Sequence, residues 1–200
     1  MHFGDVQESI NTLKKNHFDL LSLANNHAMD YGMPGLTQTL KLARQSKIDT
    51  CGAGNSEKEA AQPYLQTIRL GTESINIAIL CAYKYVKKYN YVYKHYATSH
   101  RGGVYKLNIN KLKKQILSLK NKGNILIILY LHWGKNYKFA SEYQLENGRK
   151  FVDAGADIVI GHGAHVLQEI EFRNNKWIVC NLGNFVFNSP GKYKKQCTSI

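Results

Sequence analysis

Three apolar runs of this 200-residue chain end in histidine, and we expect its chemistry at these ends. LLSLA, ILIILYL and ADIVI are the runs. A neutral imidazole binds transition metals and transfers protons near neutral pH. An asparagine oxygen can complete a metal shell or hold a phosphate oxygen. The polar residues that follow the runs are Asn25, Asn26, His27, His132, His162 and His165.

Buried strands would bring these side chains together. Ligands of open α/β sheets bind beyond the carboxyl ends of the strands, so three parallel strands would place their histidines at one edge. Such a cluster suits a divalent transition metal, which lowers the pKa of bound water and polarises a phosphoryl or acyl oxygen. We therefore predict His27 and His132 as catalytic residues. The predicted metal ligands are Asn26, His27, His132, His162 and His165.

Asp30 follows His27 by three residues. It either orients the imidazole from outside the ligand shell or caps the next helix. A single histidine at a strand end is more often a loop or cap residue, and only the threefold repetition favours a site. The histidines without such partners are predicted to be structural: His2, His17, His95 and His100.

Hydrophobic periodicity and turn residues predict the elements that position these residues. Helices are expected over 5–16, 36–45, 109–122 and 141–154, with a short one capped by Ser56. Strands are expected over 19–24, 47–54, 64–70, 75–83, 124–134, 156–165, 168–172 and 176–187, with a long loop over 87–103. This alternation predicts an α/β fold with mixed sheets.

The positive charge is confined to the middle of the chain. The net charge is +13, and residues 74–141 hold twelve lysines, one arginine and no acidic residue. One interpretation is a surface for a polyanion, and the alternative is a solvated helix face with a Lys- and Tyr-rich loop. The predicted polyanion-binding residues are Lys84, Lys87, Lys88 and Lys94.

Cysteines and apolar runs exclude several classes of protein. Cys51, Cys81, Cys180 and Cys197 show no C-x-x-C spacing, which argues against a zinc knuckle or a redox motif. No apolar run reaches the roughly 18 residues of a membrane span, and the first residues do not form a signal peptide. These features leave the location of the protein undefined.

Four segments together resemble the CapA family of capsule, or poly-γ-glutamate, synthesis proteins. They are SLANNHAMDYGMPGLTQTL, HWGKNY, GADIVIGHGAHVLQEIEF and NLGNFVF, and the resemblance covers the chain from about Val6 to Phe187. It implies a metallophosphoesterase-like fold, a layered α-β-β-α sandwich with mixed sheets, as a single domain over residues 1–200. It also implies membrane association or an extracytoplasmic location.

The resemblance assigns the same side chains to a site. Asn26 and His27 match the Asn-His motif of the family, His132 matches the histidine of HWG, and His162 and His165 match the last histidine cluster. Asn25, Asp30 and Asn184 fall where residues shape the pocket. The expected cofactor is a divalent metal ion, Mn, Fe or Zn.

Two departures from the family pattern bear on that site. The Gly-Asp and Asn-Leu-Glu motifs, whose carboxylates would share two metals, are not found, so we expect an N-terminally incomplete domain that lacks its first strands. The FGD at Phe3–Asp5 is read as a coincidence. Gly163 and Ala164 replace two residues of the usual Gly-His-His-Pro-His cluster, which leaves one imidazole fewer.

The expected function is therefore biosynthesis of an anionic cell-surface polymer, with a metal-dependent hydrolase site of the metallophosphoesterase type. The alternative is a non-catalytic accessory protein that keeps the fold and binds polymer. Expected partners are an anionic polymer or a phosphorylated substrate, and membrane proteins of capsule synthesis. Nucleic acid is the weakest candidate, because only the Lys- and Tyr-rich segment 84–96 supports it.

Overall fold

A computed structural model describes residues 6–184, and the chain divides into two compact units. Within that range, unit 1 holds residues 6–64 and 81–106, and unit 2 holds residues 65–80 and 107–184. Compact units can belong to one domain, so the expected single domain over residues 1–200 stays a prediction.

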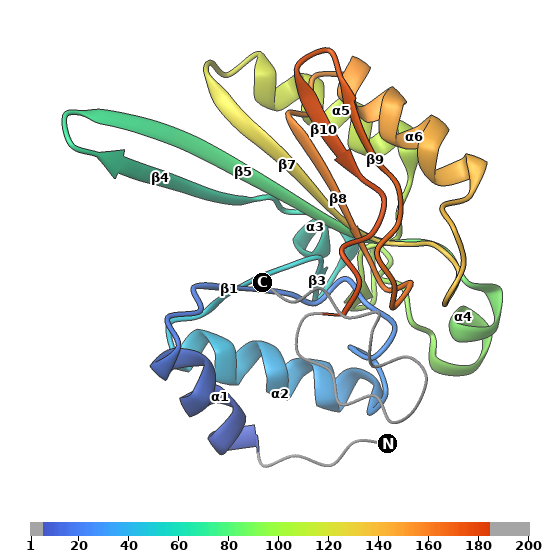
Figure 1. Cartoon of the computed structure of the whole chain (residues 1–200). Helices are drawn as coiled ribbons and strands as arrows, with labels where there is room; N and C mark the ends of the chain where they lie inside the picture. The colour runs from blue at the N-terminus through green and yellow to red at the C-terminus, as the bar shows by residue number, and fades with distance from the viewer. Residues whose placement is uncertain (1–5, 185–200) are drawn as a thin grey trace. The chain divides into compact units, whose positions relative to one another are not determined.

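Unit 1 is built from short strands and helical segments, drawn mainly in blue and green in Figure 1. Strand β1 pairs in parallel with β2, and β3 pairs antiparallel with β6. Gly52 lies between β2 and β3 with a φ of +84°, a conformation that favours glycine and that separates the two strands. The elements are α1 Val6–Lys15, β1 Leu20–Ser22, α2 Gly32–Gln45, β2 Asp49–Cys51, β3 Ala53–Gly54, α3 Glu57–Ala60, α4 Lys87–Tyr93 and β6 Gly103–Val104.

Unit 2 contains most of a six-stranded mixed sheet with the order β4-β5-β7-β8-β10-β9. Strands β7, β8 and β10 are parallel, and β9 is antiparallel to β10. The first residue of β4 and the last three of β5 belong to unit 1. The elements are β4 Tyr64–Leu70, β5 Glu73–Tyr83, α5 Ile109–Lys120, β7 Ile125–His132, α6 Glu142–Asp153, β8 Ile158–His162, β9 Ile170–Arg173 and β10 Lys176–Val179.

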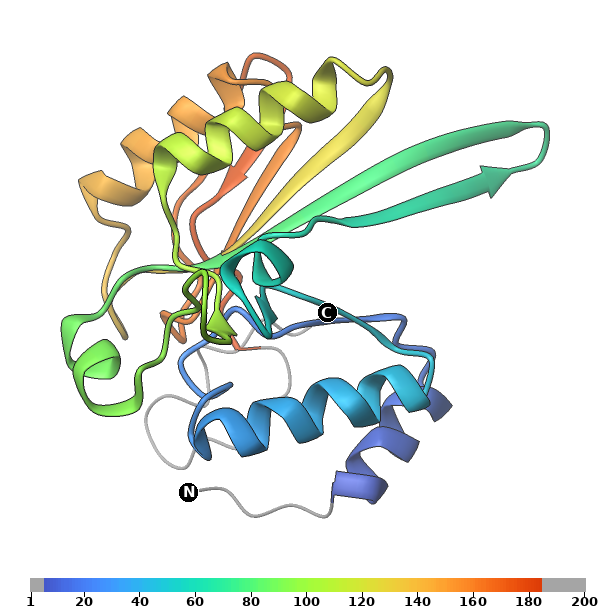
Figure 2. The same ribbon diagram turned by 180° about the vertical axis from the view of Figure 1, so that it is seen from behind.

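Helices α5 and α6 lie on one face of this sheet, as both views show (Figures 1 and 2). The Asn108 side chain caps α5 by accepting from the Lys111 N–H, and Ser141 with Gln144 forms a capping box at α6. Between the helices and the sheet lies a core of fully buried side chains. Its members include Leu112, Ile116, Phe151, Ile127, Leu129, Leu131, Val159 and Ile178.

Several sequence predictions are confirmed. The α/β class and the mixed sheet are present, and β7 and β8 are parallel neighbours whose last paired residues are His132 and His162. The hairpin of residues 64–83 forms β4 and β5. Three cysteines, Cys51, Cys81 and Cys180, are buried free thiols, while Cys197 and His2 lie outside the described residues.

Other predictions are wrong in detail. Residues 87–93 form helix α4 within the expected loop, because Tyr89 packs its ring against Tyr83 and His95, a tertiary contact that local sequence does not reveal. The expected 47–54 strand is split at Gly52. Strand β1 pairs with β2 in a separate sheet, so it does not join β7 and β8. The last strand, expected over 176–187, runs from Lys176 to Val179, and residues 185–187 lie outside the described range.

Across residues 6–184, none of the helices combines the length and the apolar character needed to cross a membrane.

Candidate functional site

The loop after β1 presents an imidazole–carboxylate pair. Asp30 Oδ2 lies 2.8 Å from His27 Nδ1, and Asn26 Nδ2 lies 3.2 Å from His27 Nε2. The His27 side chain is 67% exposed and that of Asp30 36% exposed, so both are within reach of a substrate in solvent. Through this contact Asp30 can orient the His27 ring, as the sequence predicts. The carboxylate favours the Nδ1–H tautomer and leaves Nε2 as the acceptor.

Asn25 sets the shape of this loop. Its side-chain Oδ1 accepts from the backbone N–H groups of His27 at 2.9 Å and of Ala28 at 3.0 Å. This local turn ends the β1 segment and directs His27 away from the strand. The predicted pocket residue Asn25 therefore shapes the backbone that carries His27.

A buried histidine holds Asn25 from the opposite side. His95, only 1% exposed, places Nε2 3.0 Å from the Asn25 carbonyl oxygen. Its ring lies 5.2–5.8 Å from the rings of Tyr83, Tyr89 and Tyr96. Burial lowers the pKa of His95, so at neutral pH the ring is an uncharged donor to that carbonyl. The sequence prediction that His95 is structural missed this link to the site loop, since no local pattern shows a contact across 70 positions.

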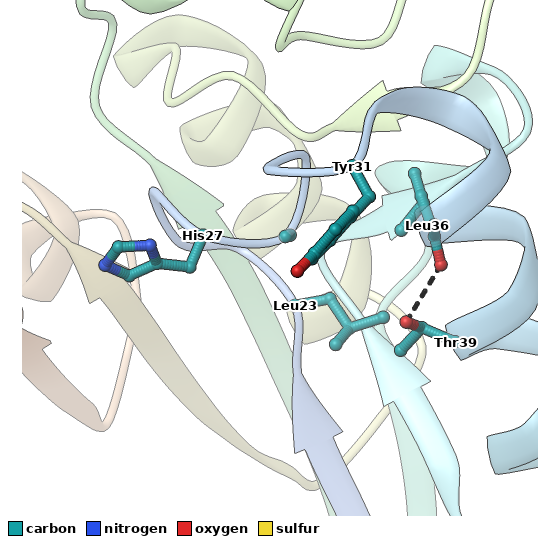
Figure 3. Close-up of a pocket in the computed structure, with 7 residues that line it drawn as sticks. Leu23, His27, Tyr31, Leu36 and Thr39 are labelled. Carbon is teal, nitrogen blue, oxygen red and sulfur yellow. Dashed lines mark hydrogen bonds between the residues drawn. The ribbon is translucent and has the colours of Figure 1, made fainter. Parts of the chain in front are cut away.

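A small pocket of about 110 Å³ lies beside the same loop, lined by His27, Tyr31, Leu36 and Thr39 among others (Figure 3). The view shows the His27 imidazole extending away from Tyr31 and Thr39. Thr39 Oγ1 already donates to the Gly35 carbonyl at 3.0 Å. The pocket is too small for a polymer, and the reactive nitrogens of His27 are directed elsewhere.

In unit 2, the ends of β7 and β8 bring two histidines together. His132 Nδ1 and His162 Nδ1 are 3.1 Å apart, so one nitrogen donates and the other accepts. Tyr130 stacks on His162 with ring centroids 4.4 Å apart. The Nε2 atom of His162 is buried and has no hydrogen-bond partner among the described residues, and burial lowers the pKa of His162 to about 4.

The glycines of this cluster explain how the rings fit. A side chain at Gly161 would overlap the Cys180 carbonyl and the Trp133 indole, whose Nε1 donates to that carbonyl at 2.9 Å. A side chain at Gly163, where φ is +98°, would overlap the His132 imidazole. The ring of His132 thus fills the space next to the position where the family pattern has another histidine.

His165 contacts a different set of residues from the His132–His162 pair. Its Nδ1 is 2.8 Å from Asn184 Oδ1, and its ring stacks on Tyr137 at 5.4 Å. Asn184, predicted to shape the pocket, therefore orients His165. The tyrosine partners Tyr130 and Tyr137 were missed by the sequence reasoning, although Tyr130 stands two residues before His132 and so shares its strand face.

The predicted site residues thus form three local groups: Asn25, Asn26, His27 and Asp30 in unit 1, and the His132–His162 and His165–Asn184 pairs in unit 2. Convergence of all the histidines in one pocket stays a prediction. Within residues 6–184, no three His, Cys, Asp or Glu side chains are grouped so that they could hold a metal ion.

The His132–His162 pair alone does not provide enough ligands for a metal ion. His132 and His162 direct their Nδ1 atoms at each other, and Gly163 contributes no imidazole. A divalent transition metal needs at least three protein donors in a usual protein site. The predicted Mn, Fe or Zn ion is therefore not supported by the described residues.

The predicted polyanion-binding lysines lie on or next to α4. Lys87 and Lys88 are exposed on the helix, and Lys94 is exposed at its C-terminal cap with a φ of 49°. Lys84 is half-buried, and its carbonyl accepts from the Tyr96 hydroxyl at 2.6 Å. Three of the four ammonium groups are thus well placed for an anionic partner.

Comparisons with known proteins relate this chain to capsule synthesis. Residues 1–189 match the family model described as "Bacterial capsule synthesis protein PGA_cap". The capsule biosynthesis protein CapA of Bacillus anthracis is 33% identical over 192 residues, and the PGA biosynthesis protein CapA of Bacillus subtilis is 31% identical over 189 residues. Each match covers 94% of this chain.

The chain spans about half the length of these curated relatives, 44% and 47%. A Mycobacterium tuberculosis protein described as "Probable polyglutamine synthesis accessory protein" is 28% identical over 178 residues, 85% of this chain and 45% of that protein. The crystal structure of TT1561 of Thermus thermophilus matches at 11% identity with a TM-score of 0.49. It covers 87% of this chain and 67% of that one, and the likeness is too slight to define the fold.

The family match extends over almost the whole chain and includes every residue of the three local groups. The mixed six-stranded sheet with its helices agrees with the predicted α/β class, and the metallophosphoesterase-like fold stays a prediction. This chain belongs to the PGA_cap family of bacterial capsule synthesis proteins.

Proposed function

We propose that this chain acts in the biosynthesis of an anionic capsule polymer of the poly-γ-glutamate type, with His27 as a proton-transfer group at a phosphate or acyl centre. Family membership supports the part in capsule synthesis. The proposed role of His27 in proton transfer is supported by the 2.8 Å contact between His27 Nδ1 and Asp30 Oδ2 on an exposed loop.

The chemistry follows from the tautomer that this contact favours. With its proton on Nδ1, held by Asp30, the His27 ring keeps a lone pair on Nε2. Nε2 can take a proton from an attacking water or hydroxyl and return it to a leaving oxygen. The Asp30 carboxylate stabilises the imidazolium that forms in between. Asn26, 3.2 Å from Nε2, can hydrogen bond a substrate oxygen at the same place.

The expected divalent metal ion stays a prediction, and no step of this proposal passes through it. A metal ion would supply Lewis-acid chemistry at the substrate oxygen. His27 needs only a substrate whose reacting oxygen lies within hydrogen-bond distance of Nε2.

Hydrolysis of bis(p-nitrophenyl) phosphate by the purified chain tests the proposal, with metal content measured in the same samples. His27→Ala should lower the rate by roughly 10²–10⁴-fold, the usual contribution of a general acid or base. Asp30→Asn should lower it less, because the ring remains but loses the group that orients it. The matched control is His100→Ala, since His100 is also exposed. Wild-type activity that survives His27→Ala would contradict the proposal.

The second candidate function is polymer binding without catalysis. The exposed lysines of α4 and the absence of acidic residues over 74–141 favour it. Poly-γ-glutamate is a polyanion, so binding should weaken steeply as salt concentration rises. If binding persists while His27→Ala has no effect on any hydrolysis, the accessory role is the better account.

A charge-matched pair of variants tests this candidate. Lys87→Gln, Lys88→Gln and Lys94→Asn, combined, should weaken binding to poly-γ-glutamate and reduce its salt dependence. The control removes three lysines from α5 and its end: Lys111→Gln, Lys114→Gln and Lys122→Gln. Equal losses in both triple variants would show only a net-charge effect. Stronger binding to single-stranded DNA than to poly-γ-glutamate would favour nucleic acid instead.

A further inference from the structure

Two buried cysteines contact each other inside unit 1. Cys51 is the last residue of β2, and Cys81 lies in the part of β5 that belongs to the same unit. Both side chains are enclosed, with exposed fractions of 2% and 3%. The Cys81 thiol donates a hydrogen bond to the Cys51 sulfur. The fold therefore brings together two thiols that lie far apart in the sequence.

Gly52 allows β5 to approach Cys51 this closely. A Cβ atom at Gly52 would lie 2.8 Å from the Cβ of Cys81 and 2.6 Å from the Cβ of Ala24, which is closer than side chains pack. The φ of Gly52 is +84°, a conformation that also favours glycine. Any larger residue would push β5 away from β2. The contact between the two thiols is thus a consequence of the backbone.

Further hydrogen bonds hold the backbone and side chain of Cys51 in place. Its carbonyl accepts from the Leu23 N–H at 2.8 Å, and its Sγ lies 3.8 Å from the Gln62 carbonyl oxygen. The Gly52 carbonyl accepts from the Tyr105 N–H at 2.8 Å. With the backbone fixed, a rotation of the side chains is the main movement needed to join the two sulfurs at the roughly 2 Å of a disulfide bond.

The shared hydrogen bond makes the two thiols chemically different. It lowers the pKa of Cys51, whose sulfur accepts, and it raises the pKa of Cys81, which donates. Cys51 therefore ionises first, and a thiolate is the nucleophile of thiol–disulfide exchange. In unit 2, burial raises the pKa of Cys180 to about 11, so that group stays a thiol at neutral pH.

We propose that Cys51 and Cys81 form a disulfide by exchange with a low-molecular-weight disulfide of the glutathione type. The Cys51 thiolate attacks one sulfur of the oxidant, whose S–S bond breaks and releases one thiolate. That thiolate takes the proton of Cys81. The Cys81 thiolate then attacks the Cys51 sulfur of the mixed disulfide and releases the second thiol, which is protonated by solvent.

The exchange oxidises two cysteine thiols and reduces one molecule of oxidant to two thiols. The two protons of the cysteines are balanced by those on the released thiols. Because both sulfurs are enclosed in the folded chain, the reaction takes place before folding is complete. The packed fold then protects the bond from reduction.

The disulfide would connect β2 to β5 below the loop that carries His27. Gly52 packs against Ala24, which directly precedes Asn25 at the start of that loop. The crosslink would close residues 52–80 into a covalent loop and so restrict the unfolded chain. Disulfide formation and the chemistry of His27 are separate claims, and either can fail alone.

Refolding of the reduced, denatured chain in a mixture of reduced and oxidised glutathione tests the proposal. The product is alkylated, digested with trypsin and mapped by mass spectrometry. Trypsin places the two cysteines in different peptides, 48–58 and 70–84. We expect these peptides to be crosslinked, and Cys180 to be alkylated. Recovery of Cys51 and Cys81 only in alkylated form would overturn the proposal, and so would a main product in which either is joined to Cys180.

Thermal unfolding with and without a reductant gives a second readout. The oxidised wild type should unfold about 5–10 °C above its reduced form, as expected for one crosslink in a chain of this size. Cys51→Ala and Cys81→Ala should each abolish this difference, and the control Cys180→Ala should keep it. Each variant is compared with itself, so a loss of stability from the substitution does not affect the result. A difference that survives in Cys51→Ala would contradict the assignment.

Discussion

At the scale of single residues, a short series of hydrogen bonds connects the core of unit 1 to its exposed histidine. Buried His95 contacts the Asn25 carbonyl, the Asn25 side chain accepts from the His27 N–H, and Asp30 contacts the His27 ring. Each contact is 2.8–3.0 Å long. The orientation of His27 is thus fixed from the backbone and from the ring, which a residue used in proton transfer requires.

His95→Phe should destabilise the chain. The new ring fits among Tyr83, Tyr89 and Tyr96 but leaves the Asn25 carbonyl without its donor. An unsatisfied buried acceptor costs about 1–3 kcal/mol of unfolding free energy. Urea unfolding measures this loss, with exposed His100→Phe as the control. Equal stability of the two variants would show that the His95 contact is not needed.

His95 should also make stability depend on pH. Burial lowers its pKa below the ordinary value of 6.5, so the unfolded chain binds a proton at a pH where the folded chain does not. The stability contributed by neutral His95 is complete above pH 6.5 and is lost as pH falls from there through the folded pKa. The loss of unfolding free energy between about pH 7.5 and about pH 5.5 should therefore be smaller in His95→Phe. A loss as large as that of the wild type would assign the effect to other groups.

Gly163 should be difficult to replace, because both its backbone conformation and the neighbouring His132 ring oppose a side chain there. Gly163→Ala places a side chain at a φ of +98° and against the His132 ring. We expect a loss of about 1–3 kcal/mol from backbone strain, with a further cost from the overlap. Gly123→Ala is the matched control, because Gly123 has a φ of +127° and open space around it. Thermal unfolding of both variants separates the two costs, and an equal loss in both would mean that His132 moves aside freely.

At the scale of elements, Asp157 connects three segments of unit 2. Its carboxylate accepts from the Ile127 N–H at the start of β7, from Lys120 at the end of α5 and from Lys176 at the start of β10, each at 2.8 Å. Burial acts to raise the pKa of Asp157, but these three donors outweigh it and lower the pKa. The carboxylate is therefore held in its charged form.

Asp157→Asn should reduce the free energy of unfolding at neutral pH by about 1.5–3 kcal/mol, the usual value for hydrogen bonds to a charged group. Since the folded pKa is lowered, this contribution is present above the ordinary pKa of 3.8 and is lost as pH falls through the folded value. The difference in unfolding free energy between the wild type and Asp157→Asn should therefore disappear at acidic pH. Glu146→Gln, which breaks an exposed pair with Lys150, is the control and should have less effect. A gap that stays constant with pH would contradict the assignment.

The elements that sequence predicts best are those with strong local signals. The unbroken apolar runs of β7 and β8 and the apolar periodicity of α5 predict these elements from the sequence alone, and the histidines stand at the ends of the two strands. Helix α4 and the role of His95 could not be predicted, because both depend on tyrosine contacts between distant positions. The pairing of β1 with β2 was missed for the same reason. A strand of three residues carries no signal for its partner.

At the scale of the whole molecule, residues 6–184 divide into two compact units, and helices α5 and α6 cover one face of the six-stranded sheet. The candidate site residues are divided between the two units. The relatives are about twice as long as the segment they share with this chain. The segment that the family model matches contains all the candidate histidines.

Polymer production by a chimaera measures the central claim most directly. In a Bacillus subtilis strain without its own CapA, the relative would be expressed with its matched segment replaced by the corresponding residues of this chain. We predict that the chimaera restores poly-γ-glutamate in the medium, that His27→Ala abolishes it, and that His100→Ala leaves it unchanged. Equal polymer yield from the chimaera with and without His27 would contradict the role assigned to this histidine.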